Sequence, residues 1–139
     1  DNVKSDAQII IARAAIETGD EAKAKVAYAK VLAIAKGELA AEALYYDAYF
    51  KNKEGKFEAS NAAVQKIAKN YSSYKYFGAK GLILMAKNFY GLKDSYQATY
   101  ILENIIQNFT DYPDVVSEAK TELNAIKTEE AKTNSSITK

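Results

Sequence analysis

The side chains that carry out most protein chemistry are scarce in this chain of 139 residues. It contains no histidine and no cysteine, which removes the commonest general base, the commonest transition-metal ligand and any thiol chemistry. The closest approach to a metal-binding group is the acidic set Asp111, Asp114 and Glu118. These carboxylates fall at the start of a predicted helix, where the helix dipole alone favours acidic residues. We therefore expect no catalytic residue, no metal site and no cofactor.

The segment Gly78–Ala79–Lys80–Gly81 superficially suggests a loop that binds phosphate. It lacks the spacing and the terminal Lys-Ser/Thr of the phosphate-binding loop, and it lies inside a helical pattern. We instead expect Gly78 and Gly81 to permit a close crossing of two helices, at a cost of about 1 kcal/mol each relative to alanine.

Charge and hydropathy narrow the kind of partner. Nineteen basic and 18 acidic residues leave a net charge of +1, which argues against binding nucleic acid or anionic membranes through bulk charge. No stretch of the sequence approaches the roughly 18 consecutive apolar residues of a membrane span. We therefore expect a protein or peptide partner, no nucleic acid and no direct insertion into a membrane.

A three-fold internal sequence repeat, which we call the echo, indicates which elements position the candidate binding side chains. Each unit has a small residue, a turn residue seven positions later and a second small residue five positions after that: Ala12–Gly19–Ala24, Ala48–Gly55–Ser60 and Ala86–Lys93–Ala98. Further apolar positions after each turn also match: Tyr28, Val64 and Leu102; Val31, Ile67 and Ile105; Ala35, Tyr71 and Phe109. The turns at residues 19, 55 and 93 are 36 and 38 residues apart, a period typical of stacked helical hairpins.

Apolar periodicity predicts seven helices and no strands, over about 6–18, 21–36, 38–53, 56–71, 74–92, 95–109 and 113–128. Ser5 or Asp6 is a plausible cap for the first helix, and Ser72 and Ser73 for the fifth. The inward stripe of the second helix is expected to include Ile34. The seventh helix has one apolar side, formed by Val116, Ala119, Leu123 and Ile126, and suits the open end of a stack. Residues 129–139 show no apolar period, and we expect a disordered tail.

The echo resembles the tetratricopeptide repeat. Gly19–Asp20–Glu21–Ala22–Lys23–Ala24 and Gly55–Lys56–Phe57–Glu58–Ala59–Ser60 are similar to the turn segment of that repeat, whereas Lys93 replaces the usual glycine in the third unit. The proline that usually closes each repeat is replaced by Lys36, Ser72 and Thr110. The resemblance implies one all-α domain over residues 1–128, a right-handed solenoid of three hairpins (about 5–37, 38–72 and 73–110) and a capping helix (113–128). Tyrosine-rich repeats of this kind resemble the C-terminal ends of long bacterial proteins, many of them exported to the cell envelope.

The resemblance also implies a binding surface, the concave face made by the first helix of each hairpin. Spacing from the turns places Asp6, Ile9 and Glu17 of the first unit there, together with Arg13, Glu42, Tyr45, Tyr49, Asn52, Lys53, Lys80, Ile83, Lys87 and Tyr90. Tyrosine suits peptide recognition, because it offers a large contact area and a hydroxyl at little entropic cost. The alternative is that Tyr45 and Tyr49 pack between neighbouring hairpins. The Lys and Asn pattern with which some family members hold a terminal carboxylate is absent.

The dense aromatic cluster Tyr71, Tyr74, Tyr76 and Phe77, with Lys75 among them, has two interpretations. One is an aromatic-filled joint between the second and third hairpins, which we favour. The other is an exposed binding patch. Such a mixture of lysine and aromatic residues could stack single-stranded nucleic acid, but the balanced charge of the chain disfavours this use.

Two functions remain open at this point. The first is a non-catalytic interaction module that binds a protein or peptide through the concave face. The second is a structural or oligomerisation segment of a longer repeat protein, possibly in assembly of the bacterial cell envelope. The predicted first helix contains Ile9, Ile10, Ile11 and Ile16 and is apolar nearly all round, which suits self-association through that helix.

Overall fold

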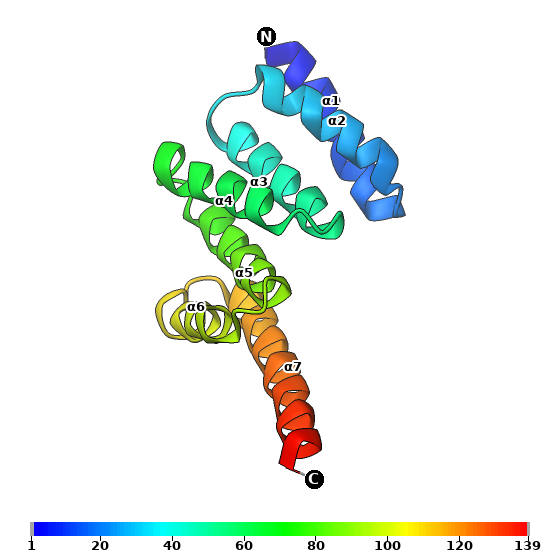
Figure 1. Cartoon of the computed structure of the whole chain (residues 1–139). Helices are drawn as coiled ribbons and strands as arrows, with labels where there is room; N and C mark the ends of the chain where they lie inside the picture. The colour runs from blue at the N-terminus through cyan, green and yellow to red at the C-terminus, as the bar shows by residue number, and fades with distance from the viewer. Residues whose placement is uncertain (1, 139) are drawn as a thin grey trace.

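The computed structural model describes residues 2–138, which form seven α-helices and no strand (Figure 1). The helices are α1 (Asn2–Thr18), α2 (Glu21–Ile34), α3 (Gly37–Lys53), α4 (Phe57–Asn70), α5 (Lys75–Gly91), α6 (Ser95–Asn108) and α7 (Pro113–Thr138). The all-α class predicted from the sequence is therefore confirmed over the described residues. Within residues 2–138, none of the helices combines the length and apolarity needed to cross a bilayer.

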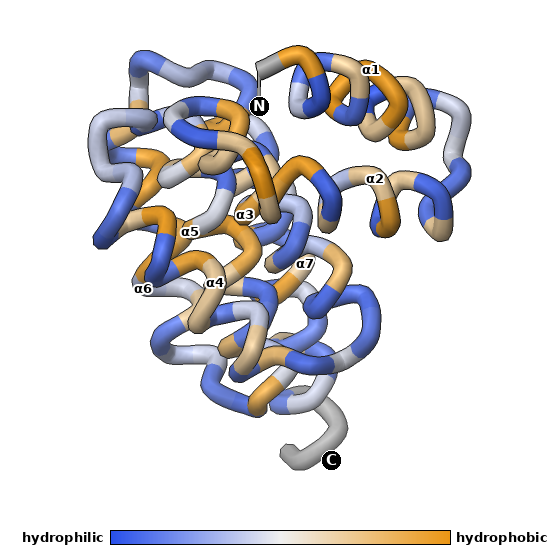
Figure 2. Tube along the Cα trace, turned by 90° about the horizontal axis from the view of Figure 1, so that it is seen from above, coloured by the Kyte–Doolittle hydropathy of each residue, from blue (hydrophilic) through white to orange (hydrophobic). Residues whose placement is uncertain are grey.

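Each helix packs against the next one in the chain, and α3 and α5 also contact the helix two places further on. The amino end of the chain lies at α1 and α2, and the carboxyl end lies at the far tip of α7 (Figure 1). The connecting turns are mostly hydrophilic (Figure 2). The buried apolar residues form three clusters, one among α1, α2 and α3, one among α3, α4 and α5, and one among α5, α6 and α7. The first helix of each pair, namely α1, α3 and α5, is therefore positioned by the partner helix that comes after its turn.

The small residues of the echo are fully buried on both sides of each turn. Ala12, Ala48 and Ala86 have 0% exposure, as do their counterparts after the turns, Ala24, Ser60 and Ala98. The hydroxyl of Ser60 is satisfied inside the core, because it donates a hydrogen bond of 2.7 Å to the carbonyl oxygen of Ala48. Larger side chains at these places would force the paired helices apart, which typically costs about 1–3 kcal/mol.

The turn residue of each unit has the left-handed backbone conformation. Gly19 has φ of 79° and Gly55 has φ of 77°, as the sequence indicates. Lys93 takes the same conformation with φ of 69° although it carries a side chain. The third turn therefore keeps the shape of the other two despite the loss of glycine, at a conformational cost of about 1 kcal/mol.

Several helix ends differ from the prediction. Helix α1 begins at Asn2, before Ser5 and Asp6, and α5 begins after Tyr74, which makes no side-chain cap. Ser72 and Ser73 therefore do not cap α5. The caps that form are Asp20 and Asp94, which accept hydrogen bonds of 3.1 Å from the backbone amides of Lys23 and Gln97. Ile34, expected inside, ends α2 with 37% exposure.

Helix α7 differs most from the prediction. It continues to Thr138, whereas the apolar pattern predicts an end at residue 128 and a disordered tail at 129–139. Alanine, glutamate and lysine favour helix here and no glycine or proline interrupts them. Its buried side uses Val115 in place of the expected Val116, together with Ala119, Leu123 and Ile126. No described side chain after Ile126 is buried, and Figure 1 shows this part of α7 projecting away from the other helices.

We predict that Lys93→Gly raises the free energy of unfolding by about 0.5–1 kcal/mol, because glycine removes the left-handed strain at the third turn. Urea denaturation measures this change. The matched control is Gly55→Ala, which should lose about 1 kcal/mol through the same backbone effect. An alanine Cβ at Gly55 would have no atom within 4 Å, so sterics do not enter the control. A destabilised Lys93→Gly variant would contradict the prediction.

Candidate functional site

An ion pair joins α1 to α3 at the first of the candidate positions. The guanidinium of Arg13 donates to both carboxylate oxygens of Glu42, at 3.0 Å from Nε and 2.7 Å from its terminal nitrogen. The hydroxyl of Tyr28 on α2 donates to the same carboxylate at 2.7 Å. Glu42 is only 6% exposed, and its hydrogen bonds raise the pKa of Arg13. Two of the predicted binding residues, Arg13 and Glu42, therefore satisfy each other, with Glu42 inaccessible to a partner.

A second contact lies on α3 about two helical turns further on. The hydroxyl of Tyr49 donates to the carboxylate of Glu21 at 2.9 Å, and the ammonium of Lys53 lies 3.9 Å from the same carboxylate. Lys53 also stands 5.3 Å from the centre of the Tyr49 ring. Partial burial, followed by the hydrogen bond to Glu21, raises the pKa of Tyr49. Tyr49 and Lys53 remain partly exposed, so this side of α3 faces solvent.

A buried amide network, which was not predicted from the sequence, joins α3, α4 and α5. Asn88 has 0% exposure and donates from its amide nitrogen to Ser60 Oγ at 2.8 Å and to Asn61 Oδ1 at 2.9 Å. Its amide oxygen accepts from Asn52 at 2.8 Å. The sequence does contain a signal for this network. Phe50 and Asn88 each lie five residues before the turn of their unit, so the third unit has an amide where the second has an aromatic ring. Asn52, expected in the groove, is thus held against the interior of the next unit.

We predict that Asn88→Ala lowers the free energy of unfolding by about 2–4 kcal/mol, because it leaves the amides of Asn52 and Asn61 without a partner and opens a cavity. Chemical denaturation measures the loss. Asn124→Ala on the exposed side of α7 is the matched control and should stay within about 0.5 kcal/mol of the parent. Equal effects of the two substitutions would refute a stabilising role for the network.

The third group is a row of aromatic rings with a lysine above it. Tyr45 is 7% exposed and packs against Tyr49 at 6.5 Å and Phe77 at 6.3 Å between ring centres. The ammonium of Lys80 stands 4.7 Å from the centre of the Tyr45 ring and 5.6 Å from that of Tyr76. Burial raises the pKa of Tyr45 well above its ordinary value. Tyr45 therefore packs between units, whereas Tyr49 and Lys80 keep exposed surface.

The acidic residues of α7 complete this surface. The Tyr76 hydroxyl donates to Asp114 at 2.7 Å, which raises the pKa of Tyr76 to about 12 and lowers that of Asp114. Lys87 on α5 forms ion pairs with Glu122 at 3.3 Å and, more distantly, with Glu118 at 4.0 Å. Across the described part of the chain, no three acidic side chains converge closely enough to hold a metal ion.

The remaining candidates differ in accessibility. Ile83 is 1% exposed and belongs to the core between α5, α6 and α7, while Tyr90 packs at the edge of the same core and is half-buried. In the first unit, Ile9 is buried at 4% exposure, whereas Asp6 and Glu17 are exposed. The structure thus leaves Arg13, Tyr49, Asn52, Lys53, Lys80, Lys87 and Tyr90 at least partly accessible and buries Glu42, Tyr45 and Ile83.

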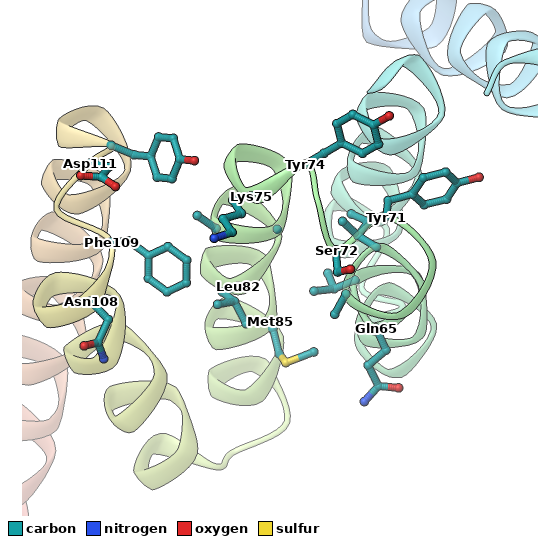
Figure 3. Close-up of a pocket in the computed structure, with 16 residues that line it drawn as sticks. Gln65, Tyr71, Ser72, Tyr74, Lys75, Leu82, Met85, Asn108, Phe109 and Asp111 are labelled. Carbon is teal, nitrogen blue, oxygen red and sulfur yellow. The ribbon is translucent and has the colours of Figure 1, made fainter. Parts of the chain in front are cut away.

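A hollow of about 690 Å³ opens on another side of the molecule, between α4, α5 and α6 (Figure 3). Its walls include Leu82, Met85 and Phe109, with Lys75 and Asp111 beside them. The aromatic cluster divides here. Tyr71 and Tyr74 lie together at one edge of the hollow, with 6.5 Å between ring centres. Tyr76 and Phe77 instead contact each other at 5.4 Å. Since Phe77 also packs on Tyr45, part of the cluster fills the joint between units, as expected.

The two glycines of α5 have different roles. A Cβ at Gly81 would lie 3.2 Å from Val64 Cγ1, so this glycine permits a close crossing of α4 and α5, as predicted from the sequence. Gly78 lines the hollow, and a Cβ there would meet nothing within 4 Å. The predicted close crossing is therefore wrong for Gly78, which leaves space beside Lys75 instead.

Comparison with known proteins adds no identification to this geometry. No protein-family model matches the chain, and no curated protein matches it in sequence.

We predict that alkaline pH destabilises the protein through its tyrosines, and that Tyr76→Phe reduces this effect. Below about pH 10 the phenol is neutral in both states. Between pH 10 and the folded pKa of about 12, Tyr76 ionises first in the unfolded chain, so the free energy of unfolding falls as pH rises. Urea midpoints at pH 9 and pH 11.5 measure the slope. Tyr100→Phe is the control for the loss of a hydroxyl at an exposed ring, at 64% exposure. An unchanged slope in Tyr76→Phe would count against the assignment.

Proposed function

We propose that the chain is a non-catalytic interaction module that binds a protein or peptide through the surface shared by α1, α3 and α5. In this proposal the helix pairs stack as the hairpins of a tetratricopeptide-like solenoid, and α7 covers its end. The binding surface comprises Arg13, Tyr49, Asn52, Lys53, Lys80, Lys87 and Tyr90, which all keep exposed side-chain area. Glu42, Tyr45 and Ile83 support this surface from beneath.

The observation that carries the proposal is the arrangement of lysine ammonium groups over tyrosine rings, of which Tyr49 and Tyr76 are half-buried and Tyr45 is buried. Lys53 stands over Tyr49, and Lys80 stands over Tyr45 and Tyr76. Among the residues whose side chains the structure describes, Lys80 forms no ion pair. An exposed cation–π contact contributes only about 0.5–1 kcal/mol, so the lysine charge stays available to a carboxylate of a partner.

This arrangement suits an extended peptide that has acidic and apolar side chains. The carboxylates of such a peptide would pair with Lys53 and Lys80, while its apolar side chains would cover the Tyr49 and Tyr90 rings. Lysines already positioned on rings lose less side-chain entropy on binding than free lysines do. At the α7 end, Glu118 and Glu122 would repel further acidic residues, so the peptide should be acidic over α3 and neutral or basic towards α7.

The test is selection from a random 12-residue peptide display library against the whole chain. We expect the selected peptides to be rich in acidic and aromatic residues. The double variant Lys53→Glu/Lys80→Glu should weaken their binding at least about tenfold, which corresponds to about 1.4 kcal/mol. Fluorescence anisotropy of labelled peptides gives the dissociation constants.

The matched control is Lys66→Glu/Lys69→Glu, which makes the same charge change at two exposed lysines of α4. It should leave peptide affinity within about twofold of the parent, because long-range charge effects are screened at physiological salt. An equal loss of peptide affinity in both double variants would show that only net charge matters. Peptides that respond to Phe109→Ala but to neither double variant would place binding in the hollow and refute the proposal.

A further inference from the structure

The second helix of one unit packs on a fixed set of positions in the first helix of the next. We call these the seam positions, and they lie 16, 12, 9 and 5 residues before the turn. In α3 they are Leu39, Ala43, Tyr46 and Phe50, and in α5 they are Phe77, Gly81, Leu84 and Asn88. All eight residues are buried or half-buried. The Tyr46 ring stacks on Tyr28 of α2 with 4.3 Å between centres, and Gly81 meets Val64 of α4.

Helix α7 uses three of the four positions, although no hairpin comes after it in the described residues; the third position holds Glu122, which pairs with Lys87. Val115, Ala119 and Ile126 lie 38 residues after Phe77, Gly81 and Asn88. Their exposures are 1%, 0% and 4%, and they share a core cluster with Leu102 and Ile105 of α6. Three consecutive first helices therefore receive the preceding second helix on the same face.

Helix α1 has the residue types of a seam, but within the described part of the chain no helix covers them. Its seam positions are Val3, Ala7, Ile10 and Ala14, and all four are exposed, Val3 at 78% and Ile10 at 67%. The second position is Ala7, Ala43, Gly81 and Ala119 in the four helices, always a residue small enough for another helix to approach closely. Ile11, beside this face, is also exposed at 40%. A contiguous exposed apolar face of this kind marks an interaction surface.

We propose that the seam face of α1 binds the second helix of a further helical hairpin from outside these 139 residues. The incoming helix would present a face like that of α2 or α4, with aromatic or aliphatic residues spaced as Tyr28 and Val31 or Val64 and Ile67 are. It would cover Val3, Ala7, Ile10 and Ala14 as α2 covers α3. This inference does not depend on the proposed peptide-binding surface.

A second copy of the chain does not supply such a helix. The matching faces of α2, α4 and α6 are already covered by α3, α5 and α7, so each would have to leave its own core to bind α1. The residues that would lose their present burial include Val31, Ile67 and Ile105, each with 0% exposure. The occupant is therefore a hairpin whose second helix has no following helix of its own.

The experiment supplies such a hairpin from the chain itself. A tandem variant carries a copy of residues 1–37 directly before Asn2, so that Asn2 takes the place of residue 38 after the added α2. Residues 2 and 38 are 36 positions apart, which is the spacing of the first two turns, so the inner α1 keeps the register of α3. The variant then has an outer α1, which stays uncovered, and an inner α1, on which the added α2 can pack. Ala7 matches Ala43 in size, so the added helix meets the same small residue as in the native seam.

Thiol accessibility reports the outcome, because the chain contains no native cysteine. Ile10→Cys is introduced into the parent, into the inner α1 or into the outer α1, and reacted with a maleimide. The inner thiol should react at least about tenfold more slowly than the other two, since reaction then requires local opening of the seam. Ile10→Asp should likewise lower the melting temperature when placed in the inner copy and not when placed in the outer copy.

Two results would overturn the inference. Equal reaction rates of the inner and outer thiols, with equal melting temperatures of the two Asp variants, would show that the seam face does not accept a hairpin. Protection of the parent thiol that grows with protein concentration, together with a dimer in light scattering, would assign the face to a second copy. Neither result involves Lys53 or Lys80, so peptide binding is judged separately.

Discussion

The packing of small, buried residues on both sides of each turn is the constraint on which the rest of the structure depends. Ala12 with Ala24, Ala48 with Ser60 and Ala86 with Ala98 are all excluded from solvent. Since these residues fix how closely paired helices approach, they also fix where the next residues along each helix point. The left-handed turn seven positions away completes the geometry, and it holds even where Lys93 replaces glycine.

Polar contacts between units are the second organising element. Arg13 with Glu42, Asn52 with Asn88 and Tyr76 with Asp114 join residues 29, 36 and 38 positions apart. Two of these contacts lie at buried groups, Glu42 and Asn88, where loss of one partner leaves an unsatisfied polar atom. The units are therefore matched by specific pairs in addition to apolar packing, and neighbouring units depend on one another.

Features that depend on periodicity were predictable from the sequence, whereas features that depend on individual partners were not. Helix number, the turn residues and the buried small residues came from spacing alone, because helical geometry repeats regularly. The boundaries of α1 and α7 were missed, because the ends of a helix depend on local capping and on helix propensity outside the core. At the candidate site, spacing placed Arg13, Tyr49 and Lys80 on the first helices. It could not show that Glu42 and Asn52 are held by Tyr28 and Asn88, since such pairs form between distant segments.

The contacts between units also have a mechanical consequence. A chain of helices that touched only through apolar side chains could slide or bend at each junction with little penalty, because dispersion contacts are not directional. The bidentate Arg13–Glu42 pair and the amide network around Asn88 are directional, and they hold one orientation of each junction. The relative orientation of α1, α3 and α5 is therefore fixed before any partner arrives, and we expect this part of the chain to resist bending at those junctions.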